Sequence, residues 1–425
     1  MPLFCNVAKM NLNGKKIKLE VLGCRTNSYE GDAILSVLED EGAKRDENWD
    51  IYILLSCTIT SVADRKCKKL LRRARRENNS GVIACLGCFA ETLSEAEAKE
   101  LGIDILLGNR LKHLLLPCLQ DFLATGEPIY KKHGNLLHCP DWDSQFLKKP
   151  CLHTRAFVKV QDGCNHFCSY CTVPLVRGLP VSRDVNDTLD EVKSLIANGC
   201  REVVLTGVHL GLHQHLPLLV ERLSELAGLA RLRFGSIEPL SVTEELLREL
   251  KNSPIFMPHL HIPLQSGSNK TLTAMKRGYT TEEFARIMRS CRETLGRDLQ
   301  ITTDFLLGFP TETEEDFEES LAFLERQEFG HTHVFPFSPR EGTVAASLTP
   351  LPPSVIRSRL DKAMEVAHRL DANFVAKFRG TQQEILVEES SNGIVTGHTR
   401  NFILIKGKSN ASVNDIITLT DWQIA

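Results

Sequence analysis

Short apolar runs alternate with longer amphipathic stretches through most of this 425-residue chain. Between residues 15 and 125, the runs 17–22, 51–55 and 82–86 have the length and composition of buried strands, and a helical pattern follows each of them. This alternation is typical of a parallel sheet whose strands are joined by helices. We therefore predict an amino-terminal parallel α/β domain over residues 15–125.

The same rhythm resumes after residues 126–149, which are rich in turn residues and are predicted to be a linker. Six further apolar runs follow, each with a helical stretch behind it: 156–160, 202–206, 232–236, 260–263, 301–307 and 333–336. Six such units predict a partial (β/α)6 barrel over residues 150–373. The active site of such a barrel lies at the carboxyl-terminal rim of its strands.

The last part of the chain has a different pattern. After Gly380 the apolar runs are short and separated by turn residues, at 384–387, 401–405 and 416–419. Closely spaced short strands predict a small β-barrel over residues 374–425. The fold class as a whole is α/β.

Composition limits the functions open to the chain. The formal net charge is −3, so any contact with nucleic acid must come from a local patch, of which the basic stretch 65–76 is the best candidate. We see neither an apolar leader nor a run of ~18 apolar residues, and we expect a cytoplasmic protein without a membrane span. In that reducing compartment the 14 cysteines are expected to bind metal or pack as small apolar side chains, rather than to form disulfides.

Three cysteines stand close together directly after the predicted strand 156–160. Cys164, Cys168 and Cys171 have the spacing C-x3-C-x2-C. Three thiolates on one loop can hold three irons of a [4Fe–4S] cluster and leave the fourth iron open. A zinc site would more often show paired C-x2-C units and four ligands, and three structural cysteines are the plainer alternative. This spacing resembles that of the radical S-adenosylmethionine (SAM) superfamily, in which SAM completes the cluster.

Polar or flexible residues follow the later strands of the predicted barrel. Gly207, Glu238 and Gln265 lie at successive strand ends, and Tyr170 lies inside the cysteine loop. We expect these four residues to bind SAM: Gly207 through close backbone approach, Glu238 at a ribose hydroxyl, and Tyr170 against adenine. An ordinary turn glycine and simple loop packing of Tyr170 are the alternatives. We name no catalytic acid or base.

A second set of cysteines is dispersed through the amino-terminal domain. Cys24, Cys57 and Cys88 each lie just past a predicted strand. Because the carboxyl ends of parallel strands meet at one edge of the sheet, these cysteines should converge in space. From spacing alone, packing and metal binding remain equally open.

Nearly the whole chain resembles the MiaB-like radical SAM methylthiotransferases. The resemblance rests on the cysteine loop and on the segments 22–27, 56–58 and 87–90. It implies a second [4Fe–4S] cluster held by Cys24, Cys57 and Cys88, and a carboxyl-terminal RNA-binding domain of the TRAM type. Ser56 departs from the family, which often has Thr before this cysteine, but the ligand itself is kept.

Three rim segments, 206–211, 236–239 and 333–340, resemble the branch of this family that acts on threonylcarbamoyladenosine beside the tRNA anticodon. The resemblance implies that a methylthio group replaces the hydrogen on carbon 2, with one SAM as methyl donor and another as radical source. It implies the tRNA anticodon stem-loop as partner, and an electron donor and a sulfur donor that the sequence does not identify. We expect a monomer. The alternatives are isopentenyladenosine in tRNA, a ribosomal-protein aspartate, or a non-catalytic iron–sulfur RNA-binding protein.

Overall fold

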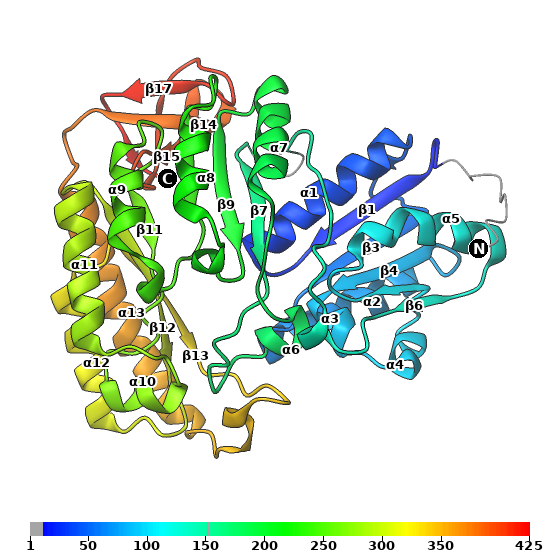
Figure 1. Ribbon diagram of the computed structural model, residues 1–425, viewed down its shortest axis with the longest axis horizontal. Coiled ribbons are helices and arrows are strands. Elements are labelled where there is room, and N and C mark those ends of the chain that lie inside the picture. The colour runs from blue at the N-terminus through cyan, green and yellow to red at the C-terminus, as the bar shows by residue number, and fades with distance from the viewer. Residues whose placement is uncertain (1–11, 151–153) are drawn as a thin grey trace. The chain divides into compact units, whose positions relative to one another are not determined.

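The computed structural model describes residues 12–150 and 154–425 (Figure 1). It divides into two compact units. One holds the described residues of Met1–Leu152 together with Val173–Leu179, and the other holds those of His153–Thr172 together with Pro180–Ala425. Cys5 and Cys151, expected to be packing residues, lie outside the described residues. No helix in the described ranges is both long and apolar enough to cross a membrane.

The first unit is built on a six-stranded parallel sheet in the order β2-β1-β3-β4-β5-β6. Its strands are β1 (Lys16–Val21), β2 (Lys44–Arg45), β3 (Ile51–Ser56), β4 (Val82–Gly87), β5 (Ile105–Leu107) and β6 (Ile129–Lys131). Its helices are α1 (Arg25–Asp40), α2 (Ser61–Glu77), α3 (Cys88–Thr92), α4 (Glu95–Glu100), α5 (Leu115–Thr125) and α6 (Val173–Arg177). The predicted parallel α/β sheet is confirmed.

Each face of this sheet carries its own apolar core. Ile53 and Leu55 of β3 pack with α1 and α5, whereas Tyr52 and Leu54 pack with α2 on the opposite face. Side chains alternate between the two faces along a strand, so a strand covered by helices on both sides must be apolar throughout. β6 pairs with β5 and extends the sheet into residues predicted to form a linker. The sequence does not indicate this strand, because three residues are too few to show a periodicity.

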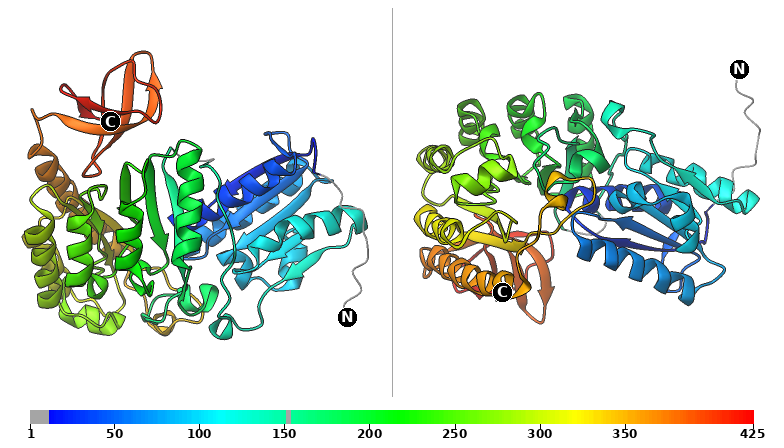
Figure 2. Two further views of the ribbon diagram at one scale, coloured as in Figure 1. Left: turned by 45° about the horizontal axis from the view of Figure 1, so that its top comes forward. Right: turned by 90° about the horizontal axis from the view of Figure 1, so that it is seen from below.

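The second unit contains six parallel strands, and Figure 2 shows its helices outside the curved row that these strands form. The strands are β7 (Ala156–Asp162), β9 (Glu202–Gly207), β10 (Arg231–Phe234), β11 (His259–His261), β12 (Gln300–Leu307) and β13 (His331–Pro336), with β8 (Val181–Ser182) antiparallel at the edge. The helices are α7 (Val185–Ala197), α8 (Leu216–Ser224), α9 (Glu244–Asn252), α10 (Asn269–Met275), α11 (Thr281–Leu295), α12 (Glu314–Gln327) and α13 (Pro353–Ala376). A parallel bridge between Ser236 and His261 links the two sheets β10-β9-β7-β8 and β11-β12-β13. The predicted partial barrel is confirmed.

A five-stranded antiparallel sheet in the order β17-β14-β15-β16-β18 ends the chain. Its strands are β14 (Gln383–Ser391), β15 (Ile394–Thr399), β16 (Leu404–Lys408), β17 (Ile416–Leu419) and β18 (Gln423–Ile424). The strand predicted at 401–405 begins only at Leu404, because Phe402 has a positive φ in the preceding turn. β15 is not among the strands that the sequence predicts, and it contains Gly397. A Cβ at Gly397 would lie 2.0 Å from the Leu386 carbonyl oxygen, so glycine is what allows β14 to approach.

This carboxyl-terminal sheet packs against the amino-terminal ends of the barrel strands. Arg233 of β10 donates to the carbonyl oxygens of Thr399 at 2.7 Å and Arg400 at 2.8 Å. The ring of His259, the first residue of β11, stacks on Phe402 with 4.4 Å between centroids. The sheet therefore lies at the opposite end of the strands from their carboxyl-terminal rim.

Candidate active site

The loop that carries Cys164, Cys168 and Cys171 follows β7 at the barrel rim. Gly163, with φ of 75°, turns the chain out of the strand, and its amide donates to the Asp162 carboxylate at 2.9 Å. Cys168 is buried, while Cys164 and Cys171 are half-buried. The three predicted ligands are thus held on one short loop with limited access to water.

Backbone contacts with distant segments fix the middle of this loop. The amide of Ser169 donates to the Met275 carbonyl at 3.0 Å, and the Ser169 carbonyl accepts from the Ala345 amide at 2.7 Å. Tyr170 packs against an apolar cluster that includes Met275 and Phe309. The plainer alternative for Tyr170, packing of the loop, is therefore present in the structure, while its contact with adenine stays a prediction.

The chemistry of the thiols fits a metal cluster. Burial raises the pKa of Cys164 to about 11, so near neutral pH the thiol stays protonated until a metal such as iron displaces its proton. Among the described residues, no three His, Cys, Asp or Glu side chains are gathered tightly enough to hold a single metal ion. A cubane spreads its three sulfur ligands over three irons, and a loop with this spacing suits it better than a single-ion site.

A buried arginine that the sequence did not indicate contacts the loop. Arg277, just past α10, donates from Nη1 to the Cys168 sulfur at 3.3 Å and from Nε to the Tyr279 hydroxyl at 3.1 Å. Its Nη2 forms an ion pair with Glu238. Glu238, predicted at the ribose, is therefore coupled to a predicted cluster ligand through one guanidinium.

Two buried side chains near this rim have polar atoms without a partner among the described residues: the ring nitrogens of His209 and Oε1 of Gln265. The His209 ring meets that of His166 edge-on at 4.5 Å. Unpaired buried polar atoms are costly, and they are expected where a polar ligand completes their hydrogen bonds. These atoms fit the polar groups of SAM or of a base.

Gly207 has a packing role of its own. A Cβ at this position would lie 2.9 Å from side-chain atoms of Gln161. Gln161 in turn accepts a hydrogen bond from the His209 amide at 2.8 Å. The glycine is therefore needed to hold the segment around His209 against β7, and a contact between Gly207 and SAM stays a prediction.

In the first unit, Cys24, Cys57 and Cys88 follow the neighbouring strands β1, β3 and β4. Cys24 and Cys57 line the same pocket, which has a volume of about 380 Å³. Gly23, with φ of 108°, allows this approach, since a Cβ there would lie 3.1 Å from the Cys57 sulfur. The expected convergence at one sheet edge is present.

Burial and hydrogen bonding differ among these three thiols. Cys24 is exposed, whereas burial raises the pKa of Cys57 to about 12, with Cys88 and Cys24 adding to the effect. The Cys88 sulfur accepts from Nε of Arg177 at 3.2 Å and lies 3.5 Å from Nδ2 of Asn109. As at Cys168, a buried guanidinium donates to one of the predicted cluster ligands.

Comparison with known proteins agrees with this geometry. Residues 158–324 match the model of the Radical SAM superfamily, and residues 16–108 match that of the Uncharacterized protein family UPF0004. The fold resembles the radical SAM methyltransferase TsrM from Kitasatospora setae, determined with cobalamin and a [4Fe–4S] cluster, with a TM-score of 0.58 and 15% identity over 78% of this chain and 74% of that one. The fold and the cysteine loop together define a radical SAM enzyme.

Sequence relatives narrow the assignment. The chain is 33% identical to the threonylcarbamoyladenosine tRNA methylthiotransferase MtaB of Bacillus subtilis, over 92% of this chain and 89% of the relative. It is 32% identical to the tRNA-2-methylthio-N(6)-dimethylallyladenosine synthase of Aquifex aeolicus, over 91% and 90%. The chain belongs to the MiaB-like family of radical SAM methylthiotransferases, and its cofactors are [4Fe–4S] clusters and SAM.

Proposed function

We propose that this enzyme replaces the hydrogen on carbon 2 of threonylcarbamoyladenosine, beside the anticodon of tRNA, with a methylthio group. The observation that carries the proposal is the presence of two cysteine trios, each at the carboxyl ends of parallel strands, in a chain similar to MtaB proteins over most of its length. We expect it to act as a cytoplasmic monomer on the anticodon stem-loop.

Cys164, Cys168 and Cys171 are proposed to hold one cluster, and Cys24, Cys57 and Cys88 the other. With SAM bound, the first cluster supplies the one-electron reduction that cleaves a carbon–sulfur bond of SAM. In the complete reaction the hydrogen of carbon 2 would leave as part of 5'-deoxyadenosine. A methylthio group held by the cluster at Cys24, Cys57 and Cys88 would separate from that cluster and bond to carbon 2, and one electron would return to the iron–sulfur cluster. The methyl group comes from a second SAM, while a reductant and a sulfur source must be supplied from outside the chain.

The protein's own side chains bind and orient the reactants. His209 and Gln265 offer buried polar atoms that can hydrogen bond to SAM or to the base. Arg277 fixes the Cys168 sulfur, and Glu238 fixes Arg277. Gly207 keeps the His209 segment in place, and Tyr170 closes the loop against the apolar cluster.

The test is mass spectrometry of tRNA nucleosides from a host that lacks this gene and then regains it. The methylthio form of threonylcarbamoyladenosine should disappear, return with the intact gene, and fail to return with Cys168→Ala. Cys200→Ala is the matched control, because Cys200 is also buried but lies just before β9, away from the rim.

A second candidate substrate follows from the dimethylallyladenosine synthases, whose identity to this chain is close to that of the MtaB proteins. If methylthio-dimethylallyladenosine is the nucleoside that disappears without the gene and returns with it, dimethylallyladenosine is the substrate. A methylthiolated ribosomal-protein aspartate, or RNA binding without SAM cleavage, would support the remaining alternatives.

A further inference from the structure

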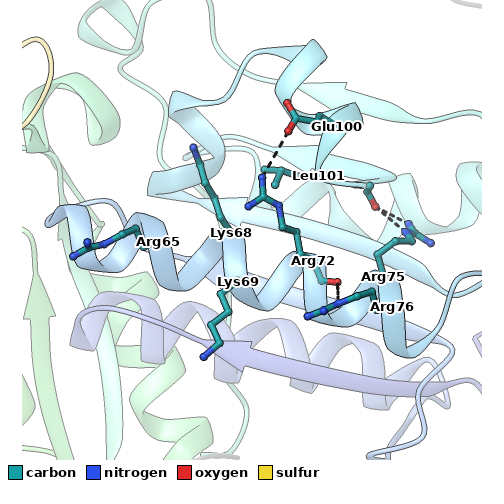
Figure 3. A pocket seen from close by; sticks show the side chains of 9 residues that line it. Arg65, Lys68, Lys69, Arg72, Arg75, Arg76, Glu100 and Leu101 are labelled. Atoms are coloured by element: carbon teal, nitrogen blue, oxygen red, sulfur yellow. Dashed lines mark hydrogen bonds and ion pairs between the residues drawn. The ribbon is translucent and has the colours of Figure 1, made fainter.

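A basic groove runs along α2 in the first unit (Figure 3). It has a volume of about 570 Å³, and its cationic wall is formed by one face of the helix. The residues that line it are Arg65, Lys68, Lys69, Arg72, Arg75, Arg76, Glu100, Leu101 and Gly102. A chain with a net charge of −3 therefore concentrates six cations around one groove with a single acid.

Two of the cationic side chains of α2 are paired with groups elsewhere in the first unit. Arg75 forms an ion pair with Asp104 at 2.6 Å and donates to the carbonyl oxygen of Gly102, also at 2.6 Å. Arg73, on the neighbouring face, is paired with Glu20 at 2.8 Å. These two arginines hold the helix to the rest of the unit, so we do not count them among the ligands of the groove.

The other groove cations have little to hold them. Within the part of the chain that the structure describes, Arg65, Lys68, Lys69 and Arg76 form no ion pair with a carboxylate. Arg72 reaches only Glu100, at 3.7 Å, and both side chains are more than half exposed. Exposed pairs of this kind contribute little to stability.

The spacing of these cations matches a single helix face. Arg65, Lys68, Arg72 and Arg76 follow one another at intervals of three or four residues, and so line up over about 16 Å. Like charges at this spacing destabilise a helix. The helix dipole offsets this only in the last turn, at Arg76, and does not act on Arg65 and Lys68 nearer the amino terminus of the helix. A polyanion lying along the face would neutralise all of them.

The position of α2 indicates which polyanion. Thr60, the N-cap of α2, and Lys66 line the same pocket as Cys24 and Cys57. The helix has 17 residues and so extends for about 26 Å from this pocket. A nucleic-acid strand with one base at the cysteine pocket would place its neighbouring phosphates within reach of the groove.

We propose that the α2 groove binds backbone phosphates of the tRNA anticodon stem-loop next to the modified base. Arg65, Lys68, Lys69, Arg72 and Arg76 are the phosphate ligands. The arginines suit bidentate contact and the lysines act as point charges. The inference rests on the proposed function for the identity of the RNA, and it makes the amino-terminal unit an RNA-binding surface in its own right.

The experiment compares the reconstituted full-length enzyme with the variant K68Q/K69Q/R72Q/R76Q. Glutamine is about as good a helix former as lysine or arginine, so α2 should persist. Fluorescence anisotropy with an unmodified tRNA transcript should show affinity at least about tenfold weaker, and a slope of log affinity against log salt that is shallower by about 3. An anticodon stem-loop hairpin should show the same loss.

The control variant is R248Q/K251Q, which removes two exposed cations from α9 in the other unit. It should leave both the affinity and the salt slope at the wild-type values. Iron content and SAM cleavage without RNA should match the wild type in both variants, which shows that the fold and the clusters are intact.

Unchanged tRNA affinity in the quadruple variant overturns the proposal. The proposal is also overturned if the quadruple variant binds tRNA normally but loses binding to phosphatidylserine–phosphatidylcholine vesicles, because the groove would then be a membrane-binding surface. The proposed function is tested separately, by mass spectrometry of the nucleosides. If the enzyme modifies another base and the quadruple variant still loses tRNA affinity, the groove is an RNA-binding site but threonylcarbamoyladenosine is not the substrate.

Discussion

Arg177 donates a hydrogen bond from Nε to the sulfur of Cys88 at 3.2 Å, and both side chains are buried. Arg177 lies in α6, the short helix that follows the Cys164–Cys171 loop in the chain, and its Nη2 also donates to Asn27 at 2.6 Å. The second unit repeats this relationship between Arg277 and Cys168. Hydrogen bonds to cluster sulfurs are one of the means by which a protein sets a reduction potential.

We predict that Arg177→Gln lowers the reduction potential of the cluster proposed at Cys24, Cys57 and Cys88. A cation and a hydrogen-bond donor at sulfur stabilise the more negative, reduced cluster, so their removal disfavours reduction. A redox titration followed by electron paramagnetic resonance measures the effect, and Arg177→Lys, which keeps the charge, should shift the potential less. Equal potentials in all three proteins would show that Arg177 does not tune this cluster.

We predict that the unpartnered ring nitrogens of His209 lower the stability of the protein but strengthen its binding of SAM. Its two unpartnered ring nitrogens are buried, so His209→Leu should raise the free energy of unfolding by about 1 kcal/mol. The same substitution should weaken SAM binding about tenfold in equilibrium dialysis, by loss of a hydrogen bond worth ~1.4 kcal/mol.

His213→Leu is the matched control for this prediction. The His213 ring is also buried, but its Nε2 lies 3.0 Å from the Arg183 carbonyl and its Nδ1 accepts from the His215 amide at 3.2 Å. Its replacement should therefore destabilise the protein. A destabilised His209→Leu with normal SAM binding would refute a ligand-binding role for His209.

The pH dependence of stability should carry the signature of His209. Burial lowers the pKa of His209 to about 4, whereas an unfolded histidine titrates near its ordinary value of 6.5. Between these values the unfolded state takes up a proton that the folded state does not, so stability falls as the pH drops from 6.5 to 4. The loss is at most about 3 kcal/mol. Denaturant unfolding at pH 7 and pH 5 should show a larger loss in the wild type than in His209→Leu, and equal losses would contradict the assignment.

Glu202→Gln is predicted to loosen the carboxyl-terminal sheet. The buried Glu202 carboxylate lies 2.9 Å from Arg233 and 3.5 Å from both Arg155 and Arg231. Removing its charge leaves three guanidiniums partly uncompensated, at a cost of about 3 kcal/mol. Limited proteolysis near Gly380 should become faster, while Glu315→Gln, at an exposed site on α12, should change nothing. Unaltered cleavage in Glu202→Gln would show that the charge cluster does not hold the sheet.

The sequence predicts correctly which strands the cysteines follow, because strand periodicity and the spacing C-x3-C-x2-C are local patterns. Their role as cluster ligands stays a prediction. It does not reveal Arg177 or Arg277, since each lies far along the chain from the sulfur that it contacts. A local signal was available at Arg177, which is a charged residue within the otherwise apolar helix α6. Similarly, His209 is visible as part of a glycine-flanked segment, but only the fold shows that its ring nitrogens lack partners.

The carboxyl-terminal sheet is attached to β10 through Arg233 and to the start of β11 through His259, so the barrel separates this sheet from the cysteine loop. The cysteine loop lies at the other end of these strands, and the eight residues of β12 measure about 26 Å. If this sheet binds RNA, the bound RNA and the cysteine loop are held at a fixed distance from each other. The enzyme would then select RNA by length. An RNA too short to reach both the sheet and the cysteine loop would lose one of its two contacts with the enzyme.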